Sequence, residues 1–178
     1  ELSYIYLEDH EMEFFKMDSD NNRLIFYIND RGYSKLGILN LSNNDSQIFE
    51  NPHEVTFMEP TYGWGACVLD ESNILLTINS TNQNGEIIKF NLDTQKYEFF
   101  KKAYEGDIKL NNLPKPTLHS FKTFDDRDIP FFFLKPENFK QGEDNPVLIL
   151  IHGGPEGQER PTFKPELQYL VNQGIGIL

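Results

Sequence analysis

The stretch that decides the fold is Asn145-Pro-Val-Leu-Ile-Leu-Ile-His-Gly-Gly-Pro-Glu-Gly-Gln158, near the end of the 178-residue chain. Residues 147–151 are consecutive aliphatic side chains between a proline and a glycine pair, which predicts a strand buried on both faces. Open α/β sheets bind ligands at the carboxyl ends of such strands, where glycines let the backbone approach a substrate closely. These residues alone leave two interpretations of Gly153-Gly154 open: a loop that binds an oxyanion, or an ordinary strand-to-loop turn.

A helix is predicted after this loop. The apolar side chains recur at i, i+4, i+7 and i+8, which places them on one helix face. These side chains are Phe163, Leu167, Leu170 and Val171. Pro165 lies near the predicted start and Gly174 just beyond the predicted last turn, where these residue types are favoured. The helix is therefore expected to end before residue 174, and a new strand to follow it.

A hairpin is predicted before the deciding stretch. Residues 117–123 and 128–135 are strand-like and flank the polar turn 124–127. The neighbouring carboxylates Asp125 and Asp126 are interpreted as solvated turn formers rather than as an acid-base pair. Hairpin, buried strand, glycine loop, helix and strand, in this order, predict the opening of an α/β fold.

The first hundred residues read as short strands separated by turns of Asn, Asp, Ser and Gly. The first strand-like segments are residues 13–17, 23–28, 35–41 and 46–49. The pattern then recurs, because residues 20–29 resemble residues 70–79 and residues 35–41 resemble residues 86–92. A repeat of about four strands is typical of a β-propeller blade, and a β-sandwich of similar hairpins is the alternative.

Composition excludes several classes of partner. The chain has 28 Asp and Glu against 16 Lys and Arg, a formal net charge of -12, which argues against nucleic acid. Cys67 is the only cysteine, so no disulfide framework and no cysteine metal site are expected. A reducing compartment is permitted, and a cytoplasmic location is expected. His10, His53 and His119 are too widely spaced to suggest a metal site, and no apolar run is long enough to span a membrane.

Both ends of the sequence look internal to a larger protein. The chain starts within the alternating pattern of residues 2–7 and ends as a strand pattern begins after Gly174. We therefore expect it to be a piece of a longer protein.

With these residues in view, the chain resembles the prolyl oligopeptidase family of serine peptidases, especially its acylaminoacyl-peptidase and dipeptidyl-peptidase-like bacterial members. The match is strongest over residues 147–178, where the strand, His152-Gly-Gly-Pro155, Gly157-Gln158 and the helix pattern follow the family's order. The resemblance implies a mainly β plus α/β fold. A partial β-propeller of about two blades is expected in residues 1–110, a linker in residues 111–116, and the truncated N-terminal part of an α/β-hydrolase domain in residues 117–178.

The resemblance also implies roles for the loop. In α/β hydrolases a backbone N–H of this loop forms half of the oxyanion hole, which assigns the donor to Gly154, with Gly153 as the alternative. His152 is not expected to be the catalytic base, because the triad histidine of this fold follows the nucleophile in sequence. Its expected role is to hold the loop by hydrogen bonding. The candidates for the substrate cleft, with solvated loop residues as the alternative, are Glu156, Gln158 and Arg160.

The sequence departs from the family at the nucleophile. No Gly-x-Ser-x-Gly occurs in the 178 residues, so this chain by itself is predicted to be inactive. For the full-length parent, the resemblance implies hydrolysis of short peptides through a seryl acyl-enzyme, without a cofactor or metal, and allows a homo-oligomer. Two alternatives stay open: an esterase or lipase of the same fold, and a noncatalytic propeller module that binds a partner.

Overall fold

The computed structural model describes residues 11–18, 22–50, 56–57, 67–68, 70, 72–103, 106, 113–154 and 157–178. The chain folds as two compact units, one of Glu1–Asn79 with Gly85–Tyr104 and the other of Ser80–Asn84 with Glu105–Leu178. Their identities as propeller and hydrolase parts stay predictions. The described residues form mostly antiparallel sheet with one short helix. No helix among them is long and apolar enough to span a membrane.

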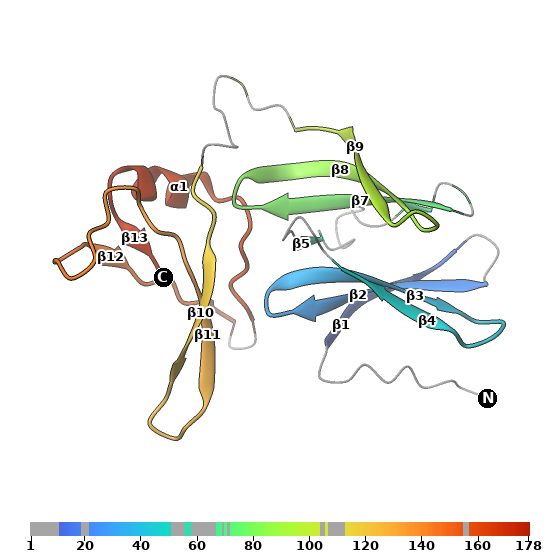
Figure 1. Ribbon diagram of the computed structural model, residues 1–178, viewed down its shortest axis with the longest axis horizontal. Helices are drawn as coiled ribbons and strands as arrows, with labels where there is room; N and C mark the ends of the chain where they lie inside the picture. The colour runs from blue at the N-terminus through green and yellow to red at the C-terminus, as the bar shows by residue number, and fades with distance from the viewer. Residues whose placement is uncertain are drawn as a thin grey trace. The chain divides into compact units, whose positions relative to one another are not determined.

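The first sheet is an antiparallel meander in the order β1-β2-β3-β4 (Figure 1). Its strands are β1 (Glu11–Met17), β2 (Arg23–Asp30), β3 (Tyr33–Asn40) and β4 (Ser46–Phe49). These strands confirm the predicted strands of this region. The turn between β2 and β3 uses Arg31 at φ 54° and Gly32 at φ 92°, and the N–H of Gly32 donates to Asn29 Oδ1 at 2.8 Å. Backbone with positive φ and an Asx contact is what the predicted turn chemistry requires.

The second sheet repeats this arrangement, with the path β5-β7-β8-β9 and β6 also paired to β7. Its strands are β5 (Thr56–Phe57), β6 (Cys67–Val68), β7 (Asn73–Ser80), β8 (Gln83–Asn91) and β9 (Lys96–Lys101). Strands β7 and β8 occupy the places of β2 and β3, so the sequence repeat corresponds to equivalent strands of two sheets.

The two sheets of the first unit share one hydrophobic core. Ile25 and Tyr27 of β2 pack in the same cluster as Leu76 and Ile78 of β7, and all four are almost fully buried. The N–H of Phe57 on β5 also donates to the buried Ser34 Oγ on β3 at 3.0 Å. Both a pair of blades and a sandwich would have such a core.

The outer face of the first sheet distinguishes the two interpretations. Phe26 and Ile28 point away from the shared core, yet both are fully buried in a second cluster with Leu39. A sandwich sheet normally exposes its outer face to water, whereas a propeller blade is covered on both faces. Burial on both faces therefore favours the blade interpretation.

An aspartate orders the turn before each of β2 and β7. Asp18 Oδ1 accepts the N–H groups of Asn22 at 2.9 Å and Arg23 at 3.1 Å, and Asp18 Oδ2 accepts Arg23 Nε at 2.8 Å. Asp70 Oδ1 accepts the N–H of Ser72 at 2.9 Å and Asn73 Nδ2 at 2.8 Å. In both turns the aspartate binds the first residue of the following strand, Arg23 of β2 or Asn73 of β7. Asp18 lies five residues before Arg23, whereas Asp70 lies three residues before Asn73. Asp20, which the sequence repeat aligns with Asp70, lies outside the described residues.

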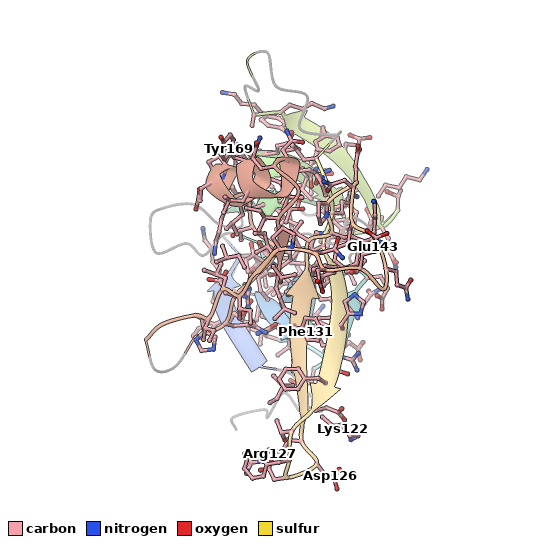
Figure 2. All side chains as sticks on the ribbon, turned by 90° about the vertical axis from the view of Figure 1, so that its left-hand side faces the viewer. Lys122, Asp126, Arg127, Phe131, Glu143 and Tyr169 are labelled. Carbon is pink, nitrogen blue, oxygen red and sulfur yellow. The ribbon has the colours of Figure 1, made fainter. Side chains whose placement is uncertain are left out.

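The second unit contains the predicted hairpin of β10 (Thr117–Lys122) and β11 (Asp128–Phe133). Its turn carries Asp126 at φ 63° and an Arg127–Asp125 ion pair with Nε and Oδ2 2.9 Å apart. Figure 2 shows Asp126 and Arg127 at the tip of the hairpin with Lys122 nearby, and all three are exposed. The structure therefore agrees with the interpretation of Asp125 and Asp126 as turn formers.

The rest of the second unit is a strand-helix-strand unit. Strand β12 (Val147–Leu148) pairs in parallel with β13 (Gly176–Ile177), and helix α1 (Pro165–Asn172) connects them in sequence. Pro165 is the first helical residue, and Gly174 has φ 86° beyond the last turn, as predicted. The predicted helix face is also confirmed from Leu167 onward, since Leu167, Leu170 and Val171 pack with Leu134 and Ile177. Phe163 precedes the helix.

The prediction of a strand buried on both faces over residues 147–151 was wrong. Only residues 147 and 148 form strand, and the side chains of Ile149 and Ile151 are 63% and 80% exposed. Strand β12 has one partner, β13, among the described residues, so no second neighbouring strand extends its ladder. An aliphatic run predicts burial only if further elements of the sheet cover it, and that condition is not met here.

Candidate functional site

The candidate loop follows β12 at the carboxyl end of a parallel pair. Val147 is opposite Gly176 and Leu148 is opposite Ile177, so both strands run toward the same edge. The pairing continues beyond β12, because the N–H of Leu150 donates to the carbonyl oxygen of Leu178 at 2.7 Å. Residues 152–154 leave the sheet directly after this contact. The loop therefore lies at the kind of edge where α/β sheets bind ligands.

Gly154 has a backbone conformation that favours glycine. Its φ is 122°, in the range that L-residues with side chains rarely adopt. A Cβ atom at Gly153 would meet no other atom within 4 Å, so the space beside that residue is open. Both glycines are exposed to solvent. The glycine pair thus presents exposed backbone to which a substrate atom has access.

His152 is exposed and interacts with its own loop. Its Nδ1 lies 3.2 Å from the carbonyl oxygen of Gly153. A carbonyl oxygen can only accept, so this hydrogen bond requires the proton on Nδ1. The contact is of the loop-holding kind expected for His152.

The structure describes two of the three cleft candidates, Gln158 and Arg160. Gln158 is exposed and Arg160 is partly buried, and both lie in the segment that leads to α1. Beside them Lys164 Nζ forms an ion pair with Glu159 Oε2. Glu156 lies outside the described residues. The role of all three residues in a cleft stays a prediction.

Sequence reasoning assigned no role to Gly157. A Cβ atom there would lie 2.9 Å from the carbonyl oxygen of Gly153 and 3.2 Å from His152 Nδ1. Gly157 therefore lies against His152 and the carbonyl oxygen of Gly153. The sequence signal is the Gly157-Gln158 pair that follows the family's order, and this pair does not specify the contact.

Metal ligands are not gathered in the described part of the chain, where no group of three His, Cys, Asp or Glu side chains could hold an ion. His119, the only described histidine besides His152, is exposed on β10. Its Nε2 lies 2.7 Å from Thr117 Oγ1 and its ring stacks on Phe131 with 5.5 Å between centroids.

Several solved structures of peptidases superpose on this chain. A puromycin-hydrolysing peptidase of Mycobacterium tuberculosis superposes with a TM-score of 0.69 at 18% identity, over 92% of this chain and 24% of that one. The acylaminoacyl peptidase of Pyrococcus horikoshii gives a TM-score of 0.72 at 19% identity, over 96% and 25%. A structure from a study of two prolyl endopeptidases gives 0.75 at 13% identity, over 96% and 24%.

The chain has the fold of one part of these peptidases. It spans about a quarter of the length of each, and at these identities the similarity establishes the fold. No family model and no curated protein sequence matches the chain. The resemblance to the prolyl oligopeptidase family inferred from the sequence is therefore supported at the level of structure.

Proposed function

We propose that this chain is part of a serine peptidase that cleaves short peptides, and that the N–H of Gly154 forms half of its oxyanion hole. The observation that carries the proposal is an exposed glycine at φ 122°, at the carboxyl edge of a parallel strand pair, in a fold that known peptidases contain. The parent protein supplies the nucleophile, because this chain has no Gly-x-Ser-x-Gly.

The chemistry assigned to Gly154 is electrostatic. When a serine oxygen adds to the scissile carbonyl carbon, the π electrons of the carbonyl move to its oxygen, and a general base takes the serine proton. An N–H aimed at that oxygen stabilises the new negative charge without reorganising. Removal of one such donor lowers kcat about 100- to 1,000-fold in known cases.

The first test concerns the reaction class of the full-length protein. Its rates on acyl-peptide substrates and on aliphatic esters should be compared, and we expect faster cleavage of the peptides. A full-length protein that cleaves only esters would instead be an esterase of the same fold, and one that cleaves neither but binds a partner stably would be a binding module.

The second test concerns Gly154 in the full-length protein. Gly154→Pro removes the N–H, and we expect kcat to fall about 100- to 1,000-fold. Proline also fixes φ near -65°, which conflicts with the observed φ of 122°. Gly154→Ala is the matched control, because it meets a similar conflict but keeps the N–H. If thermal melts show that both variants are folded and the two lose equal activity, the N–H of Gly154 is not the oxyanion donor.

A further inference from the structure

We infer that Gly157 and His152 are positioning residues that fix the peptide group between Gly153 and Gly154, and thereby aim the Gly154 N–H. The inference rests on the proposed function, and deepens it by naming the residues that hold the oxyanion donor in place. It is based on contacts made by one atom, the carbonyl oxygen of Gly153.

That oxygen is held from two sides. On one side His152 Nδ1 donates to it at 3.2 Å. On the other side Gly157 is so close that even a Cβ atom on it would lie 2.9 Å from the oxygen, nearer than real Cβ contacts allow. The same Cβ atom would lie 3.2 Å from His152 Nδ1 and 3.7 Å from His152 Cγ. Gly157 therefore has to lack a side chain for the oxygen and the imidazole to keep these positions.

Peptide planarity transmits this restraint to the donor. The structure has no cis peptide bond among the described residues, so the C=O of Gly153 and the N–H of Gly154 share one plane and point in opposite directions. A glycine on each side of this peptide group would otherwise allow it to rotate easily. Fixing the carbonyl oxygen thus fixes the direction of the N–H, which must match the position of an oxyanion closely.

The first experiment introduces Gly157→Ala into the full-length protein. The added methyl group displaces the carbonyl oxygen, so we expect kcat to fall about 10- to 100-fold with KM within about twofold. Affinity for a peptide aldehyde, which forms a tetrahedral adduct with a serine, should fall by the same factor, while affinity for the product peptide should not change. A loss of affinity for the aldehyde adduct without a loss of affinity for the product peptide indicates a misaligned oxyanion donor, because a general folding defect would weaken both.

Gly37→Ala is the matched control. Its Cβ atom would lie 2.2 Å from ring atoms of Phe26 in the core of the first unit, so it also adds a steric conflict at a glycine. We expect this variant to lower the melting temperature but to leave kcat and aldehyde affinity of the folded protein unchanged. An equal loss of aldehyde affinity in both variants would overturn the inference.

The second experiment replaces His152, whose Nδ1 donates to the carbonyl oxygen of Gly153. The amide nitrogen of Asn can occupy the place of histidine Nδ1, whereas the longer Gln places its nitrogen near the position of Nε2. We therefore expect His152→Asn to retain most of the activity, and His152→Ala and His152→Gln to lose about tenfold in kcat. Equal losses in all three variants would overturn the role of His152.

The outcomes separate this inference from the proposed function. If the unmodified full-length protein neither cleaves peptides nor binds the aldehyde, the proposed function fails, and the inference fails with it. If the unmodified protein is active and Gly157→Ala matches it in kcat and aldehyde affinity, the inference fails alone.

Discussion

Asp18 is a single residue whose charge state is coupled to the stability of the first unit. Its burial alone would raise the pKa of the carboxyl group, but the hydrogen bonds from the Arg23 side chain and from the N–H groups of Arg23 and Asn22 outweigh this and hold the pKa below its usual value. The unfolded chain therefore binds the proton more tightly than the folded chain. The resulting stabilisation is fully present above the unfolded pKa, near 4, and is lost as the pH falls through the lower folded pKa.

This coupling predicts the effect of Asp18→Asn. The amide cannot form the ion pair with Arg23, so we expect the free energy of unfolding at pH 7 to fall by about 1–3 kcal/mol. The difference from the unmodified chain should narrow as the pH falls below about 4, where the unfolded form of the unmodified chain binds the proton, and on through the lower folded pKa, where the folded form binds it. Urea unfolding at several pH values measures both effects. Asp93→Asn, which removes an exposed carboxylate from the turn after β8, is the control for loss of one charge. A difference that stays constant down to pH 2 would contradict this account.

Residue-level predictions succeeded where local chemistry decides the conformation. Asn44 at φ 61° and Gly32 at φ 92° adopt the positive φ values expected of their residue types in turns. The structure shows the glycine pair as exposed backbone after a strand, and its role as an oxyanion loop stays a prediction. Gly157 was missed, because its significance is a contact with the carbonyl oxygen of Gly153 that only the folded loop creates.

Helix α1 is an element whose end is specified by its sequence. The N–H of Gly174 donates to the carbonyl oxygen of Val171 at 2.9 Å, and the N–H of Ile175 donates to that of Leu170 at 3.1 Å. This pair of bonds is a Schellman motif, and Leu170 and Ile175 pack on the same hydrophobic cluster, as that motif favours. The glycine therefore both ends the helix and directs the chain into β13.

The motif predicts a cost for Gly174→Ala. The residue has φ 86°, and its Cβ atom would also lie 2.6 Å from Asn138 Nδ2, so we expect the second unit to lose about 1–3 kcal/mol of stability. Gly142→Ala is the matched control, since Gly142 has φ 84° but no atom within 4 Å of its Cβ position. Gly142→Ala should lower the stability only by the cost of a positive φ for alanine, about 1 kcal/mol. Thermal melts of both variants give the two values, and equal losses would show that the contact with Asn138 is unimportant.

Elements with a local signature were thus predictable, and those that depend on distant partners were not. The hairpin β10–β11 follows from two strand-like segments around a polar turn, and α1 follows from its apolar face and its terminal residues. The strand predicted over residues 147–151 was too long, because the length and burial of a strand depend on the strands that pair with it from elsewhere in the sequence.

At the scale of the whole molecule, the exposed aliphatic run is the feature that the fold leaves uncovered. Among the described residues β12 has β13 on one side only, and the side chains of residues 147–151 are all exposed. An exposed apolar strand with an unpaired edge favours association with other chains. In the peptidases that share this fold, the matched region is about a quarter of the chain, so much more of the protein can contribute to covering such a strand.

We therefore expect the double variant Ile149→Lys, Ile151→Lys to behave oppositely in two settings. In the 178-residue chain these side chains are 63% and 80% exposed, so the variant should keep the same melting temperature and remain monomeric at about tenfold higher concentration in sedimentation velocity. In the full-length protein, where we propose that the sheet is completed, two buried lysines should cost several kcal/mol or prevent folding. Tyr169→Lys on α1, which is 65% exposed outside the strand, is the control and should not change self-association. If the full-length protein tolerates both lysines, the run is an exposed strand in the parent as well, and the proposed completion of its sheet is wrong.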